Sequence, residues 1–361
     1  MSKKLSERSR NILEAVVFDY IQGAEPVSSR TISSRYAPDL SPASVRNVMA
    51  DLEAMGYLSQ PHTSAGRMPT AKGFRFYVDS LVELKELTKS IKKMIVGNYN
   101  DSLELDEIMK KTSSILSNIS HCAGIVLAPR LNDVALRHIK LIRIGGGDII
   151  IVLVSRLGTT QSRVVHMNED LKQAELDKMS NYLSSVARGL SLTQLREKIT
   201  EEMRKEKNLY NRLLSRAMKL GMEILAESRK DDVYVDGRLN ILEQPEFSED
   251  AKKLRRIFKA FEEKSLLVRL LDKSIRSKDV HVDIGFENGL DGIEGCSLVT
   301  APYGNKENTL GTLGVIGPVR MNYPVVIPLV RYTASMLGEI LERRRGLGMD
   351  KSFSVRGIYG R

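Results

Sequence analysis

Apolar positions in the first third of the chain recur every three or four residues, a spacing that places side chains on one face of a helix. The pattern predicts helices over residues 6–21, 42–54 and 105–120. It also predicts an amphipathic helix over 74–96, which ends before the polar stretch 98–102. The apolar stripe of the 42–54 helix consists of Val45, Val48, Met49 and Leu52.

From Gly124 onward the period of the apolar positions changes to two, as in strands. Segments rich in Val and Ile lie at 134–144, 149–155 and 159–167, with glycine turns between them. This arrangement predicts an antiparallel meander. Its triple glycine, 145–147, lacks the lysine and the following helix of a phosphate-binding loop, so a turn is the favoured interpretation.

Helical and strand signals return in the second half of the chain. A helix is predicted over 173–186, and the chain closes with a helix over 324–345. Strands are predicted at 280–286, 296–303 and 311–317. Two groups of strands thus flank a charged helical segment. The simplest account is one α+β domain interrupted by an insertion at roughly 190–275.

The insertion contains a short heptad-like pattern. Apolar residues at a 3-4 spacing extend over just over two heptads, at Tyr210, Leu213, Ala217, Leu220 and Ile224. Two interpretations remain open, because so short a pattern fits both a self-association helix and a helix packed on its own domain.

The 42–54 helix has a second face that suits DNA. Ser41 is a natural N-cap, and Pro42 takes the first helical position, where a missing N–H costs nothing. The face opposite the apolar stripe carries small residues and one amide, and it is flanked by a hydroxyl and a cation. These residues are Ala43, Asn47, Ala50 and Ala54, with Ser44 and Arg46 at the flanks. Alanines let the backbone approach base edges, Asn pairs geometrically with adenine, and Arg pairs with guanine.

A short hairpin follows this helix. Residues 57–60 and 67–68 read as strands around a tip of small and polar residues. Helix, turn, helix and hairpin in this order predict a winged helix-turn-helix whose second helix enters the major groove. A plain three-helix unit with a solvated outer face is the alternative. His62, Thr63, Ser64 and Arg67 around the tip suit contact with phosphates or the minor groove. Arg30 and the N-cap residue Ser41 are further predicted DNA-binding residues.

Composition narrows the class of protein. The formal net charge of +10 favours a polyanionic partner, although the excess is spread along the chain. The two cysteines, Cys122 and Cys296, lack the spacing of a metal site, so no metal or other cofactor is expected. The N-terminus has no signal-peptide pattern, and no apolar run approaches a membrane span, which predicts a soluble cytoplasmic protein. Five scattered histidines and the absence of a Gly-x-Ser-x-Gly elbow argue against an enzyme.

Three long strings resemble the HrcA family of heat-inducible transcription repressors. They are 25–31, 40–47 and 60–79, and the resemblance is strongest over residues 5–80. It implies a homodimeric repressor of chaperone operons, an inverted-repeat operator called CIRCE, and activation by the chaperonin GroEL. It also implies a GAF-like host domain with an inserted dimerising domain.

With these implications, the chain divides into a winged-helix domain, a linker helix, two halves of a GAF-like domain, an insert that forms dimers and a C-terminal tail. The predicted bounds are 1–97, 98–120, 121–190, 191–275, 276–345 and 346–361, with the insert at 191–275 between the two halves. Two other classes remain as alternatives to a chaperonin-tuned repressor. One is a transcription factor that senses a small ligand through the GAF-like domain, and the other is an enzyme with an appended DNA-binding domain.

Overall fold

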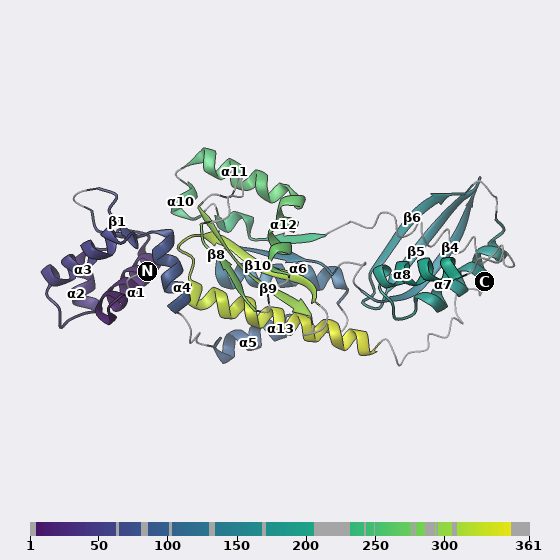
Figure 1. The fold of residues 1–361 in the computed structure, drawn as a ribbon, viewed down its shortest axis with the longest axis horizontal. Helices are drawn as coiled ribbons and strands as arrows, with labels where there is room; N and C mark the ends of the chain where they lie inside the picture. The colour runs from purple at the N-terminus through teal and green to yellow at the C-terminus, as the bar shows by residue number, and fades with distance from the viewer. Residues whose placement is uncertain are drawn as a thin grey trace.

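The computed structural model describes residues 5–62, 65–80, 86–100, 103–129, 134–167, 171–205 and 232–347, the last range with gaps at 242, 249, 276, 278, 286–292, 294 and 305–308. Helices and strands are both abundant, which confirms the predicted α+β class. Figure 1 shows three parts in a row, with the N-terminal helices at one end, a five-stranded sheet in the middle and a three-stranded sheet at the other end.

The N-terminal part comprises four helices and a small hairpin. Their bounds are α1 Glu7–Gly23, α2 Ser29–Arg35, α3 Pro42–Ala54, β1 Leu58–Ser59, β2 Met68–Pro69 and α4 Ala71–Ser80. The predicted helix over 74–96 is wrong as a single element, because a new helix, α5 (Lys89–Gly97), begins after Thr88. The Thr88 hydroxyl accepts a hydrogen bond from the amide of Ile91, which caps that helix.

The middle part is built on a sheet with strand order β7-β3-β10-β9-β8. The strands are β3 Ala123–Leu127, β7 Val233–Asp236, β8 His281–Asp283, β9 Cys296–Gly304 and β10 Thr309–Pro318. Alternate residues of these strands pack into two cores, one under α6 (Leu105–Ser120) and α13 (Tyr323–Leu347), the other under α11 (Ala251–Glu262) and α12 (Lys264–Ser274). Two short elements, η1 Arg238–Ile241 and α10 Pro245–Ser248, connect β7 to α11.

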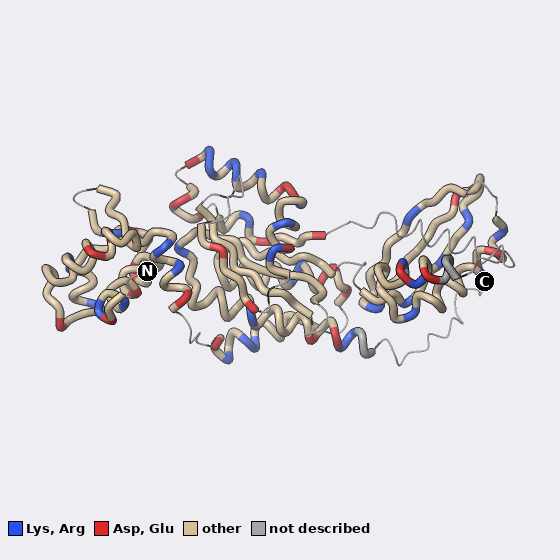
Figure 2. The backbone as a smooth tube through the Cα atoms, viewed as in Figure 1, with Lys and Arg blue, Asp and Glu red and all other residues tan. Residues whose placement is uncertain are grey.

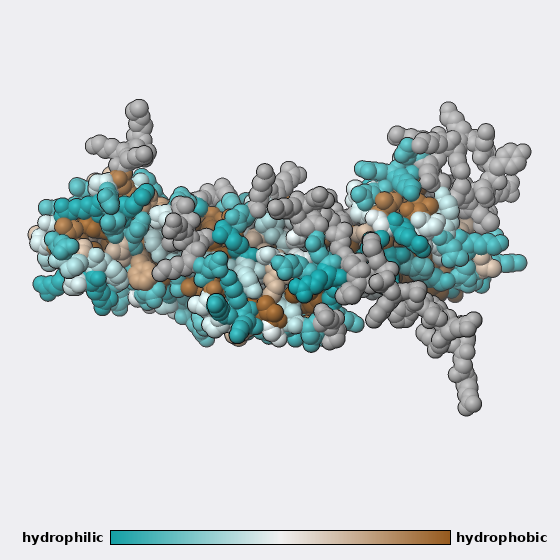
Figure 3. All heavy atoms as spheres, turned by 90° about the horizontal axis from the view of Figure 1, so that it is seen from below, coloured by the Kyte–Doolittle hydropathy of each residue, from teal (hydrophilic) through white to brown (hydrophobic). Residues whose placement is uncertain are grey.

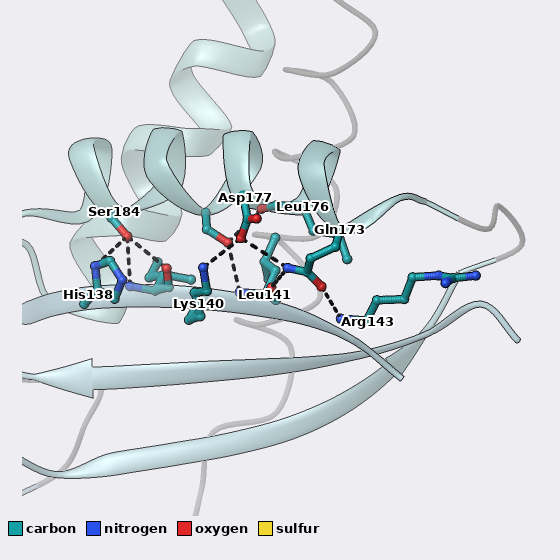
Figure 4. Close-up of polar contacts among 10 residues, drawn as sticks. His138, Lys140, Leu141, Arg143, Gln173, Leu176, Asp177 and Ser184 are labelled. Carbon is teal, nitrogen blue, oxygen red and sulfur yellow. Dashed lines mark hydrogen bonds and ion pairs between the residues drawn. The ribbon is translucent and has the colours of Figure 1, made fainter. Parts of the chain in front are cut away.

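The far part contains the predicted meander. Its strands β4 Leu136–Gly145, β5 Asp148–Ser155 and β6 Thr160–His166 pair antiparallel, and α7 (Gln173–Ala187) and α8 (Leu192–Lys205) contribute to its core. Side chains of α7 bond the outer edge of β4 (Figure 4). The amides of Ile139, Leu141 and Arg143 donate to Ser184, Ser180 and Gln173 at 3.0, 2.9 and 2.9 Å. These bonds close one edge of the sheet against pairing with another strand.

The predicted division of the chain is wrong in its middle. The meander does not share a sheet with the later strands, since β4, β5 and β6 form a sheet of their own. The segment that interrupts the five-stranded sheet therefore lies between β3 and β7, not at 191–275. Helices α11 and α12, assigned to the insertion, pack on the five-stranded sheet. The helix at 105–120 is a core element rather than a linker, because Ile108, Met109 and Leu116 are buried.

Helix α13 accounts for one further difference. Its residues Tyr323–Arg344 are long and apolar enough to cross a membrane, although the sequence predicts no membrane span. However, 61% of the apolar stretch of this helix is buried inside the protein, so the helix serves as a core element of the middle part.

Both cysteines are free and buried, and burial raises the pKa of each thiol to about 12.

Candidate nucleic-acid interface

Helix α3 is held at its start and along its inner face. The Ser41 hydroxyl accepts a hydrogen bond from the amide of Ser44 at 3.2 Å, as an N-cap does. Val45, Met49 and Leu52 are buried in a core shared with α1, which confirms three of the four residues of the predicted stripe, while Val48 is half-buried. The opposite face must therefore point outward.

That outward face matches the predicted one. Ala43, Arg46, Asn47 and Ala50 are exposed, and Ser44 is half-buried beside its cap. Figure 2 shows a mostly uncharged α3, while many Lys and Arg lie on other helices. Arg46 has no ion-pair partner within the described ranges, so its guanidinium is available to an outside acceptor. A small, polar face with one unpaired cation suits entry into a groove.

The hairpin is tied to the segment before α2. Leu58 pairs with Pro69 and Ser59 with Met68, and the amides and carbonyls of Val27 and Arg67 bond reciprocally at 2.9 Å. A Cβ at Gly66 would overlap the carbonyl oxygen of Val27, so only glycine permits this approach. His62 is exposed at the tip. Thr63 and Ser64, the other predicted tip contacts, lie outside the described residues.

Arg67, a predicted phosphate contact, also pairs with a carboxylate on α3. Its Nε lies 2.8 Å from Oε2 of Glu53 on α3, and its side chain is only 16% exposed. This ion pair fixes the hairpin against the last turns of α3, a structural role that the sequence did not indicate. The phosphate contact of Arg67 stays a prediction.

Sequence reasoning missed the residues that fix these elements to each other. Besides Glu53, Lys72 donates from Nζ to the carbonyl of Met55 at 2.8 Å and lies 4.3 Å from the centroid of the Tyr57 ring. A cation near the carbonyls at a helix end is a familiar signal, but Lys72 is 17 residues away along the chain.

Helix α2 is oriented by the carboxylate of Asp19 on α1. Arg35 and the hydroxyl of Tyr36 donate to Asp19 at 3.1 and 3.0 Å. Partial burial and the bond to Asp19 raise the pKa of Tyr36, which keeps the hydroxyl a neutral donor. Arg30, a predicted contact, is exposed on the same helix. Among the described residues, no group of three or more His, Cys, Asp or Glu is placed to hold a metal ion.

We expect Arg67→Ala to weaken binding to all DNA sequences alike and to leave the salt dependence unchanged. The loss of a partly buried charged hydrogen bond should lower the free energy of unfolding by about 1–2 kcal/mol. Removal of a phosphate contact would instead lower the slope of log K against log salt by about 0.9. Anisotropy titrations at several salt concentrations measure this slope, and Arg30→Ala is the matched control. A reduced slope for Arg67→Ala would show that Arg67 contacts a phosphate.

The chain is similar to known proteins over most of its length. The model of the HrcA protein C terminal domain matches residues 106–327. The heat-inducible transcription repressor HrcA of Geobacter sulfurreducens is 47% identical over 339 residues, 94% of this chain and 98% of that protein. The repressor of the same name from Syntrophobacter fumaroxidans is 44% identical over 341 residues, 94% of this chain and 98% of that protein.

A solved structure shares the fold. A crystal structure described as that of a hypothetical protein superposes with a TM-score of 0.61 at 21% identity and covers 95% of this chain and 100% of its own. Identity at this level supports the architecture alone. The sequence relatives, in contrast, cover almost the whole chain at high identity. The chain therefore belongs to the family of heat-inducible transcription repressors called HrcA.

Proposed function

We propose that this protein, as a heat-inducible transcription repressor, binds a CIRCE-type inverted repeat as a cytoplasmic homodimer and depends on the chaperonin GroEL for its active form. The observation that carries the proposal is the outward face of α3, where Arg46 and Asn47 are exposed among alanines. This face offers two side chains that pair with specific bases and little bulk to prevent close approach.

The N-terminal part supports a winged helix-turn-helix. Helices α2 and α3 are joined by a short turn, and the β1–β2 hairpin follows α3 directly. In this arrangement α3 is the recognition helix and the hairpin is the wing, with the exposed His62 at its tip. Arg46 and Asn47 would read bases, while Arg30, His62 and the tip residues Thr63 and Ser64 would contact the backbone.

A single winged helix reads too few base pairs to find one site in a genome, and a two-fold dimer doubles the footprint. The predicted dimerisation residues, Tyr210, Leu213, Ala217, Leu220 and Ile224, lie outside the described residues.

The three-stranded sheet offers another surface for self-association. Ile142 and Val164 flank Ile150 in register on the face away from α7, and they are 40% and 63% exposed. Figure 3 shows brown patches at the surface of this end of the molecule.

We therefore propose that this sheet face contacts the second copy, within an insert whose bounds are those of the meander and the helices that follow it. The five-stranded sheet with its helices on both faces would be the GAF-like domain. Its two halves, β3 and β7 to β10, are separated by the insert.

The test is footprinting of the purified protein on its own promoter, combined with sedimentation. We expect a two-fold symmetric protected region and a dimer in solution. Ile142→Asp and Val164→Asp should raise the dimer dissociation constant by about tenfold or more, because a carboxylate would be buried without a partner. Leu239→Asp, at an apolar residue 67% exposed on the middle part, is the control and should remain dimeric. Intact dimers in both sheet variants would exclude this face, and Leu213→Asp and Leu220→Asp would then test the predicted helix.

A further inference from the structure

The N-terminal part is not tethered loosely to the middle part. One continuous apolar core includes Val16 of α1 and Phe74 of α4 together with Val282 of β8 and Tyr323 of α13. The ring centroids of Tyr20 and Phe74 are 6.1 Å apart, and those of Phe74 and Tyr323 are 6.3 Å apart. Three aromatic rings thus extend across the boundary in a chain of contacts.

Two arginines bond across the same boundary. Nη2 of Arg75 on α4 donates to the carbonyl of Val282 on β8 at 2.7 Å. Nη1 of Arg320 donates to the carbonyl of Ile21 at 3.4 Å, in the last turn of α1. A cation at this helix end also interacts favourably with the helix dipole.

Arg320 is itself held rigidly by the middle part. Its Nε pairs with Oε1 of Glu246, and its Nη2 donates to Oε1 of Gln244 at 3.1 Å. The Arg320 side chain is only 15% exposed, and Oε2 of Glu246 is buried without a hydrogen-bond partner. A guanidinium fixed at two acceptors of the middle part in this way has little freedom to follow a movement of α1.

We infer that Arg75 and Arg320 are positioning residues that set the distance and angle between the two recognition helices of a dimer, and so the operator spacing that the repressor accepts. The inference rests on the proposed binding of an inverted repeat by a homodimer. Two N-terminal parts that are held rigidly and related by a two-fold axis fit half-sites on one face of the duplex only at a fixed separation. N-terminal parts on flexible connections would accept several separations, because the half-site contacts themselves do not change.

The experiment compares operators that differ only in spacer length. The footprinted repeat is made with its own spacer and with about 5 additional base pairs, which turn one half-site by half a helical turn. A single half-site duplex is the third ligand. The variants are Arg75→Ala and a triple variant that combines it with Arg320→Met and Glu246→Gln, so that no buried carboxylate is left charged.

We expect the wild-type protein to bind the lengthened operator about tenfold or more weaker than the native one. In the triple variant this ratio should fall below about threefold, with unchanged affinity for the half-site. Arg75→Ala alone should give an intermediate ratio. This single variant tests the inference if the triple variant does not fold. Arg331→Ala is the matched control, since Arg331 forms a bidentate pair with Asp279 at 3.0 and 2.9 Å within the middle part.

The outcomes separate the inference from the proposed function. A wild-type protein that sediments as a monomer or protects no repeat would contradict the proposed function. A wild-type dimer that binds both spacers equally, or variants that retain the full discrimination, would overturn the inference alone. If the variants also lose affinity for the single half-site duplex, the arginines act on the fold of the N-terminal part rather than on its placement.

Discussion

Arg46→Ala should lose about 1–3 kcal/mol of binding free energy on the operator and little on random DNA. The reason is geometric, because Arg46 lies on the exposed face of α3 without an ion-pair partner in the described part of the chain. A guanidinium in this place can form two parallel hydrogen bonds to guanine. Competitive titration of operator and random duplexes at one salt concentration measures both losses.

Two companion variants sharpen this result. Arg46→Lys keeps the charge but lacks the rigid, planar fork of parallel donors, so it should bind random DNA normally and the operator more weakly than the wild type does. Asn47→Ala should relax the preference for adenine at one position of each half-site. If Arg46→Lys binds the operator as well as the wild type, the residue acts through charge on a phosphate, and the base-reading role is wrong.

Local signals made the recognition helix α3 predictable from the sequence. The cap at Ser41, the proline after it and the stripe of Val45, Met49 and Leu52 all act within one helix, and the structure confirms each of them. The exposed face opposite the stripe follows from the same periodicity. Contacts between elements were not predictable in this way. Arg67 read as a free cation at a hairpin, although the fold pairs it with Glu53, 14 residues earlier.

Strands were found but wrongly assigned to sheets. Alternation of Val and Ile identified β4 to β6 as well as β9 and β10, yet it contains no information on which strands pair. Partners of β3 are far away, since Val126 pairs with Leu313 on one side and Tyr234 on the other. Likewise, the acceptors that Arg75 and Arg320 reach across the boundary between the N-terminal and middle parts lie 207 and 299 residues away, where no spacing rule applies.

These distant pairings have a consequence for folding. Every residue of β3 is buried, and its neighbour β10 is separated from it by the whole insert. Pairing over such a distance folds slowly and leaves apolar strands exposed in the meantime. The uncharged stretch from Ile149 to Val154 pairs with near neighbours in the β4–β6 meander. We therefore expect β3 to stay unpaired longer than β5 during folding.

Chaperonin with ATP should therefore raise the active fraction of refolded repressor several-fold at heat-shock temperature, without changing the affinity of molecules already folded. A slow-folding chain with exposed strands is the kind of chain that a chaperonin protects from aggregation. On heating, unfolded proteins would occupy the chaperonin, the repressor would lose this help, and the operons would be released. Titration of active sites with operator DNA, with and without chaperonin and ATP across a temperature series, separates yield from affinity. Refolding at low temperature is the control, since aggregation is slower there and the two yields should converge. A complete yield without chaperonin at heat-shock temperature would exclude this mechanism and leave a ligand-sensing middle domain as the better explanation of heat induction.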